Sequence, residues 1–150
     1  MIIAALVLAL AQTGVLTPPS GWVAAPPPQP HGAIIALGAW VRPLAGAHAQ
    51  NIVLHQMPLS GKTPAAFEAD RISSLKRVAT DLSAHAEQLC GGTLSGWYAE
   101  YTVTLGDRSS RVEQTIAPGD GVVYTATYTR GKDEAEDAGA RKALSTLCVR

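Results

Sequence analysis

Two cysteines are the residues of this chain most suited to chemistry, and they lie far apart in the sequence. Cys90 precedes the pair Gly91-Gly92, and Cys148 lies close to the last residue, Arg150. Two cysteines permit only one intramolecular disulfide, and an even number of cysteines is typical of disulfides in exported proteins. We therefore predict a Cys90–Cys148 disulfide. The alternative is a reactive Cys90 thiol, which would need an activating partner that the neighbouring residues do not supply.

The remaining chemically active side chains follow no catalytic or metal-binding pattern. None of the histidines has the spacing of zinc ligands; they are His31, His48, His55 and His85. Glu100 and Glu113 could face each other on paired strands, like the carboxylates of a glycosidase, although two solvated carboxylates are the simpler interpretation. No serine lies in a nucleophile elbow, and no glycine-rich segment continues as a phosphate-binding loop. The sequence therefore predicts no catalytic residue, no metal ligand and no cofactor.

Composition excludes one class of partner and indicates a single globular domain. Twelve Lys and Arg residues balance twelve Asp and Glu residues, whereas a nucleic-acid-binding protein needs a basic excess. The chain has 150 residues, of which 47% are hydrophobic and 16% charged. Such a chain is long and apolar enough to build one core. We expect no nucleic-acid partner.

The N-terminal segment has the composition of an export signal. The first charged side chain is that of Arg42. Residues 2–10 form an unbroken apolar run, and Ala9-Leu10-Ala11 is a small-x-small sequence at its end. This pattern resembles the hydrophobic region and cleavage site of a signal peptide, and the run is shorter than the roughly 20 residues that span a bilayer. We predict that residues 1–11 are a signal peptide and that the protein is periplasmic or secreted, not integral to a membrane. The alternative is a buried first strand or helix.

A proline-rich segment separates this signal from the main domain. Residues 12–32 contain Pro18-Pro19 and a second group of prolines after Trp22. Such composition favours extended polyproline conformation over helix. We predict an arm over residues 12–32, in which Trp22 docks on the domain or binds a partner, followed by a single domain over residues 33–150.

Hydrophobic periodicity predicts strands, a helix, three more strands and a second helix. Segments 33–42 and 50–57 are rich in β-branched and aromatic residues, which indicates strands. Thr63 and Pro64 are typical of a helix start, and apolar residues then recur at spacings of three and four until Cys90. These apolar residues are Ile72, Leu75, Ala79, Leu82, Ala86 and Leu89.

The second half of the chain predicts a meander and a closing helix. Segments 97–105, 111–117 and 122–129 alternate like strands and are joined by short turns, which requires antiparallel pairing. A helix is predicted from Asp133 onward, because acidic residues favour a helix N-terminus. Each element has one apolar side, so we predict an α+β fold in which a long helix and a C-terminal helix pack on an antiparallel sheet.

The order of these elements resembles the PsbP-like superfamily, the photosystem II extrinsic proteins and their small bacterial envelope relatives. The resemblance rests on an early Gly21-Trp22, strands ending near Asn51-Ile52, a long helix, a meander carrying Glu113-Gln114 and a closing helix. The cysteine pair departs from what we expect of that group. The resemblance implies an accessory or binding role more than a reaction.

Three aromatic residues and one glutamine are the candidates for a binding surface. Tyr98 and Tyr128 are expected on the outer face of the meander, where with Trp22 they would form an aromatic patch for a partner. Gln114 is expected on the buried side, as a structural tie or as the polar feature of a pocket. We predict a non-enzymatic exported accessory or binding protein of the cell envelope, whose partner is a protein or a small ligand. The alternatives are a small hydrolase or other enzyme with a site assembled from distant residues, and an inhibitor or small-ligand carrier.

Overall fold

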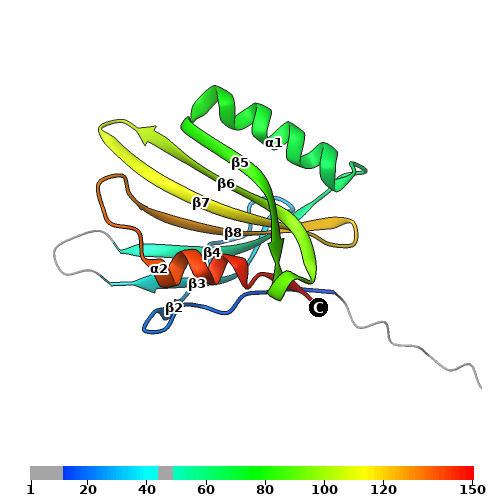
Figure 1. The fold of residues 1–150 in the computed structure, drawn as a ribbon, viewed down its shortest axis with the longest axis horizontal. Helices are drawn as coiled ribbons and strands as arrows, with labels where there is room; N and C mark the ends of the chain where they lie inside the picture. Colours follow the sequence, from blue (N-terminus) through cyan, green and yellow to red (C-terminus); the bar gives the residue numbers. More distant parts are fainter. Residues whose placement is uncertain (1–11, 44–48) are drawn as a thin grey trace, which may run out of the picture.

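The computed structural model describes residues 12–43 and 49–150, and within them one antiparallel sheet dominates (Figure 1). The predicted signal peptide, residues 1–11, lies outside the described residues. The sheet has seven strands in the order β2-β3-β4-β8-β7-β6-β5. Their bounds are β2 Val23–Ala25, β3 Ile35–Arg42, β4 Gln50–Pro58, β5 Thr80–Leu89, β6 Leu94–Leu105, β7 Arg108–Pro118 and β8 Val122–Gly131. The predicted meander is confirmed in β6, β7 and β8, and the α+β class with it.

The first helix, α1 (Pro64–Val78), is shorter than the sequence predicted. Its start is as expected, since the side chain of Thr63 accepts a hydrogen bond from the amide of Ala66 at 3.1 Å. The prediction that it continues to Cys90 is wrong, because residues 80–89 form β5 and pair with β6. The apolar residues after Ala79 suit a strand as well as a helix. Pairing with β6 gives the backbone of residues 80–89 hydrogen-bond partners along one side, and Leu89 is completely buried.

The second helix, α2 (Ala138–Ser145), begins later than the predicted Asp133. Its N-cap is Asp137, whose side chain accepts a hydrogen bond from the amide of Ala140 at 2.9 Å. The acidic residue Glu134 instead accepts a hydrogen bond from the amide of Gly131, which holds this segment in a turn. The acidic side chain of Glu134 therefore stabilises the turn before the helix and not the helix start.

The two helices lie on opposite faces of the sheet. On β7, Gln114 contacts Arg71 of α1, whereas the next residue, Thr115, donates a hydrogen bond to the carbonyl of Leu144 in α2. Successive strand residues point to opposite faces, so the helices cover both. Figure 1 shows α2 over the middle strands and α1 beside the edge that carries β5.

The disulfide is confirmed and joins two ends of the fold. Cys90 begins a short 3-10 helix, η1 (Cys90–Gly92), and Cys148 begins β9 (Cys148–Val149), with 4.8 Å between their Cα atoms. The bond therefore links the end of β5 to the strand after α2, and not the ends of two helices.

The proline-rich segment contacts the domain at several points. Its first strand, β1 (Gly14–Val15), pairs with β9, and β2 forms the edge of the main sheet. Between them, the ring of Trp22 meets that of Tyr128 edge-on, with 5.9 Å between ring centres. No helix within residues 12–43 and 49–150 is long and apolar enough to cross a membrane.

Candidate functional site

A polar pocket opens at the end of the sheet, where β4 and β7 begin and β8 ends. The antiparallel registers pair Asn51 of β4 with Thr129 of β8, and Ser110 of β7 with Gly131 of β8. Because side chains alternate along a strand, Asn51, Ser110 and Thr129 share one face. Arg108 follows the turn that joins β6 to β7 and reaches the same place. Four polar side chains from three strands thus converge.

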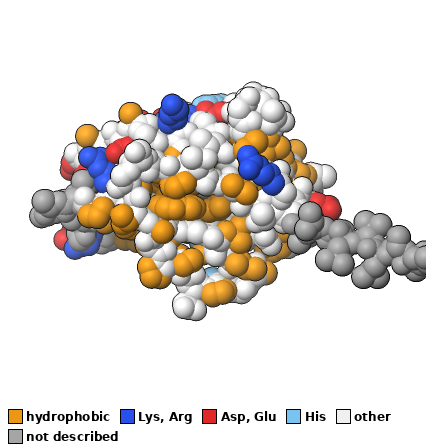
Figure 2. All heavy atoms as spheres, turned by 90° about the horizontal axis from the view of Figure 1, so that it is seen from below, with side chains coloured by type: hydrophobic (Ala, Val, Ile, Leu, Met, Phe, Trp, Pro, Cys, Tyr) orange, Lys and Arg blue, Asp and Glu red, His pale blue; other side chains and the backbone are white. Residues whose placement is uncertain are grey.

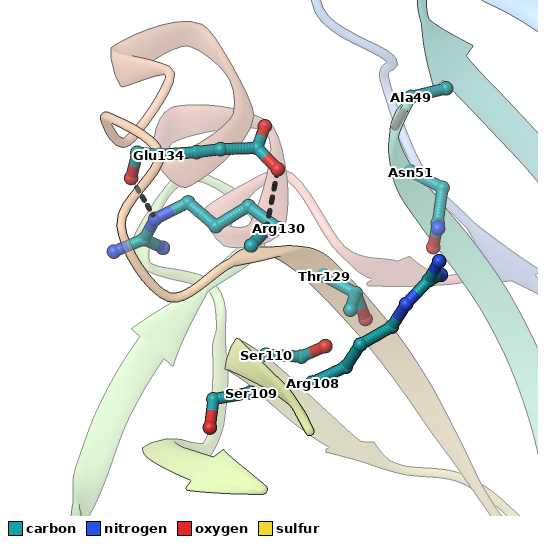
Figure 3. Close-up of a pocket in the computed structure, with 9 residues that line it drawn as sticks. Ala49, Asn51, Arg108, Ser109, Ser110, Thr129, Arg130 and Glu134 are labelled. Atoms are coloured by element: carbon teal, nitrogen blue, oxygen red, sulfur yellow. Dashed lines mark hydrogen bonds between the residues drawn. The ribbon is translucent and has the colours of Figure 1, made fainter. Parts of the chain in front are cut away.

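The pocket has the size of a small-molecule site. Its volume is about 560 Å³, and a typical ligand pocket measures 300 to 1,000 Å³. Figure 3 shows Arg108 extending toward Asn51, with Ser110 and Thr129 beside it. The full set of lining residues is Ala49, Asn51, Arg108, Ser109, Ser110, Thr129, Arg130, Gly131 and Glu134.

The charged side chains at this pocket differ in whether they have hydrogen-bond or ion-pair partners. The carboxylate of Glu134 accepts hydrogen bonds from the amide of Gly131 at 2.9 Å and from the side chain of Gln50 at 3.3 Å. Arg130 points away from Arg108, toward Glu134, and its guanidinium pairs with Glu113 on the other face of the sheet (Figure 3). Arg108 forms no ion pair and no side-chain hydrogen bond with another described residue. Its guanidinium is therefore available to a ligand.

A second polar cluster is sealed beneath α2 and centres on Glu113, which has no exposed surface. The Glu113 carboxylate accepts a hydrogen bond from the Tyr98 hydroxyl at 2.8 Å and pairs with Arg130 at 2.6 Å. Arg141 lies 3.9 Å from the same carboxylate. Burial raises the pKa of Glu113, and a hydrogen bond with Glu136 raises it further, against the opposing effects of Tyr98 and Arg130.

This sealed cluster corrects the interpretation of the two facing glutamates. Glu100 and Glu113 are indeed directly paired across β6 and β7. Glu100 is partly exposed and pairs with Arg111 at 3.3 Å, but Glu113 is fully buried, so the expectation of two solvated carboxylates is wrong for Glu113. A substrate could reach Glu113 only if the segment above it moved. The cluster therefore acts as a structural tie that holds the chain before α2 against the sheet.

Tyr98 and Tyr128 do not form the exposed aromatic patch that the sequence predicted. Their exposed fractions are 5% and 0%, because α2 covers the face on which they lie. The guanidinium of Arg141 stacks 4.0 Å above the Tyr98 ring, and Trp22 is itself partly buried against Tyr128. The prediction left the face that carries both tyrosines uncovered, but α2 packs on that face, and α1 packs on the opposite one.

Gln114 connects α1 to the sheet. Its side-chain oxygen accepts a hydrogen bond from Arg71 at 2.7 Å, and its side-chain nitrogen donates one to Thr127 at 2.7 Å. Arg71 in turn pairs with Glu68 at 2.7 Å. Of the two roles expected for Gln114, this geometry corresponds to the structural tie. Gln114 does not line the pocket at Arg108.

Hydrophobic side chains gather on a different surface, at the edge of the sheet formed by β2 and β3 (Figure 2). Val23, Ile35 and Leu37 are exposed there, to 51%, 41% and 37%. β2 pairs only with residues 39–41 of β3, so the first half of β3 lacks a neighbour on that side among the described residues. This edge is apolar, whereas the pocket at Arg108 is polar.

The structure shows no metal centre in the part of the chain that it describes. No group of three or more His, Cys, Asp or Glu side chains is placed to hold an ion there. Among the histidines, burial lowers the pKa of His55, and His85 is exposed beside the Tyr98 ring. His48 lies outside the described residues.

Sequence reasoning missed the pocket residues because their local signals indicate something else. Arg108 directly follows Gly106-Asp107, a pair of residues typical of a turn. Asn51 and Thr129 each belong to a predicted strand, and they are adjacent only because β4 pairs with β8. The one local signal is the polar run from Asp107 to Ser110, which is unusually hydrophilic for the start of a central strand.

Comparison with known proteins identifies the fold but no family. No family model matches the chain, and no curated protein matches it. Sixteen solved chains do match. The chain shares its fold with LpqN. That protein of Mycobacterium tuberculosis, described as involved in cell envelope biogenesis, is 19% identical with a TM-score of 0.62, over 91% of this chain and 84% of LpqN.

A second solved structure is similar over part of the chain. It is PA94 of Pseudomonas aeruginosa, a protein of unknown function, which is 14% identical with a TM-score of 0.51. The match covers 66% of this chain and 67% of PA94. At these identities, LpqN and PA94 establish the fold alone.

Proposed function

We propose that this protein is an exported, non-enzymatic binding protein of the bacterial cell envelope, with the accessory role that the PsbP-like resemblance implies. The observation that carries the proposal is the Cys90–Cys148 disulfide. Cytoplasmic reductants keep such thiols reduced, so a structural disulfide belongs to an exported protein. The fold shared with LpqN, a protein described as involved in envelope biogenesis, supports the same compartment.

The arrangement of polar groups favours binding over catalysis. The carboxyl with the raised pKa, Glu113, is sealed beneath α2, where no substrate touches it. The open pocket instead presents a guanidinium, hydroxyls and an amide. Its described lining includes no histidine or cysteine that could activate Ser109 or Ser110 as a nucleophile. These groups suit the recognition of a ligand, and the hydrolase alternative has no such support.

The contacts of Gln12 support a mature chain that begins near this residue. Its side-chain oxygen accepts a hydrogen bond from the amide of Asp120 at 2.7 Å, and its carbonyl accepts one from the Tyr124 hydroxyl at 3.1 Å. Gln12 therefore belongs to the folded domain. Cleavage after Ala11 would remove the apolar run and leave these contacts intact.

Fractionation of a bacterial host that expresses the full chain tests the proposal. The intact mass should correspond to a chain that begins at Gln12, in the periplasmic or secreted fraction, with thiols that react only after reduction. A matched control, Leu6→Arg with Leu8→Arg, interrupts the apolar run and should leave an uncleaved chain in the cytosol. Recovery of the wild-type chain at full length in the cytosol, with free thiols, would overturn the proposal.

A further inference from the structure

We propose that the pocket at Arg108 binds a small polyhydroxylated carboxylate, such as a sugar acid. This inference rests on the proposed role as a binding protein and gives that role a ligand class.

The pocket contains polar side chains that the fold does not use. Asn51, Ser110 and Thr129 are half-buried, and none of their side chains hydrogen-bonds to another described residue. Partly desolvated polar groups of this kind are normally satisfied by water or by a ligand. Two hydroxyls and an amide can both donate and accept, which matches the hydroxyl groups of a polyol.

Arg108 supplies the group that recognises the anion. A guanidinium presents its N–H donors in a planar fork, which matches the two oxygens of a carboxylate. The other arginine at the pocket, Arg130, is already paired with Glu113 at 2.6 Å. One guanidinium therefore remains to bind a negative charge.

Glu134 limits the ligand to a single negative charge. Figure 3 shows Glu134 and Arg108 on opposite sides of the pocket. A dianion such as a phosphate monoester would be repelled by the Glu134 carboxylate and would be neutralised by Arg108 only in part. A carboxylate held at Arg108 leaves the hydroxyl groups of the same ligand to approach Glu134, which can accept hydrogen bonds from them. The charges thus predict both the ligand class and its orientation.

The dimensions and the lining predict a small ligand and modest affinity. A volume of about 560 Å³ accommodates a ligand of one or two sugar rings. The described lining has no aromatic ring on which a sugar could stack, so recognition depends on hydrogen bonds and on the Arg108 charge. We expect a dissociation constant on the order of 0.1–1 mM.

Titration of the folded, disulfide-bonded protein with glucuronate, followed by NMR or calorimetry, tests the inference. Glucuronate should bind saturably. Glucose has no negative charge to pair with Arg108, and glucose 6-phosphate carries two negative charges in place of one. Each should therefore bind about tenfold or more weakly than glucuronate. Arg108→Ala should weaken glucuronate binding by about tenfold or more, and Thr129→Val by several-fold. The control Arg77→Ala removes an exposed guanidinium on α1 and should leave binding unchanged.

Three results would overturn the inference. The first is the absence of saturable glucuronate binding. The second is equal glucuronate binding by the wild type and by an Arg108→Ala variant whose melting temperature is unchanged. The third is tighter binding of glucose 6-phosphate than of glucuronate. None of these results concerns export or the disulfide. A cytosolic, reduced chain that still bound glucuronate would overturn the proposed location alone, so the two failures can be told apart.

Discussion

Removal of the covalent link between Cys90 and Cys148 should lower the free energy of unfolding by about 4 kcal/mol. The bond joins residues separated by 58 positions. In the chain-entropy model, a loop of this length removes about 14 cal/mol/K from the unfolded ensemble, or about 4 kcal/mol at 25 °C. Total stabilities are typically about 5–15 kcal/mol, so the disulfide supplies a large part of the whole.

The native structure has other contacts that should preserve the fold without the bond. β9 still pairs with β1, and Leu147 beside Cys148 is completely buried in the core. Loss of the disulfide should therefore destabilise the protein mainly by increasing the conformational entropy of the unfolded chain. With a urea m-value of about 2 kcal/mol/M, the unfolding midpoint should fall by about 2 M.

The assay compares urea unfolding of the oxidised protein, the same protein after reduction, and a Cys90→Ala/Cys148→Ala variant. Reduction changes only the covalent link, and the variant also removes the buried sulfur of Cys148, so the variant should be slightly less stable than the reduced protein. A difference below about 1 kcal/mol between the oxidised and reduced forms would refute the loop-closure reasoning.

Three further predictions concern the core and its buried charges. Gly96→Ala should destabilise the fold by about 1–3 kcal/mol in urea unfolding, because a Cβ there would lie 2.3 Å from the carbonyl oxygen of Ile116 on the paired strand. Tyr128→Phe should also cost about 1–3 kcal/mol in urea unfolding, because the buried hydroxyl donates to Gln50 and accepts from a backbone amide. Because the pKa of Glu113 is raised in the folded protein, its protonated side chain stabilises the fold at pH values below the ordinary glutamate pKa, and this stabilisation is lost as pH rises through the raised pKa. Glu113→Gln should remove this contribution from the pH dependence of the free energy of unfolding.

Each of these predictions has a matched control. Ser95→Ala changes an exposed side chain beside Gly96 and should be nearly neutral, and equal stability of the two variants would contradict the steric argument. Tyr124→Phe removes a hydroxyl with a single described partner and should cost less than Tyr128→Phe. Glu136→Gln should reduce the pH dependence due to Glu113 in part; an identical pH slope in wild type and Glu113→Gln would contradict the assignment.

Several features of the fold could be predicted from the sequence, because they depend on neighbouring residues or, for the disulfide, on the number of cysteines. Thr63 and Pro64 start α1 through hydrogen bonds and dihedral angles within one turn. The strands of the meander follow from alternation and from turns such as Pro118-Gly119-Asp120-Gly121, since short turns permit only antiparallel pairing. The disulfide follows from the presence of two cysteines and no others.

The end of α1 depended on a distant strand. The spacing of Leu82, Ala86 and Leu89 continues the helical pattern, but the same residues occur in a strand once β6 is available to pair with them. Hydrogen bonds to β6 are non-local, so no pattern within residues 79–90 could decide between the two conformations.

The buried and the accessible polar groups were likewise decided by tertiary structure. The strand pattern shows that Tyr98 and Glu113 share a face, but only the position of α2 decides that this face is buried. The pocket has the same origin, because Asn51, Ser110 and Thr129 become neighbours through strand register. The sequence by itself determined the strands of the meander, the start of α1 and which cysteines pair. The tertiary structure decided which polar groups are sealed and which can meet a ligand, because both outcomes depend on which elements cover each face of the sheet.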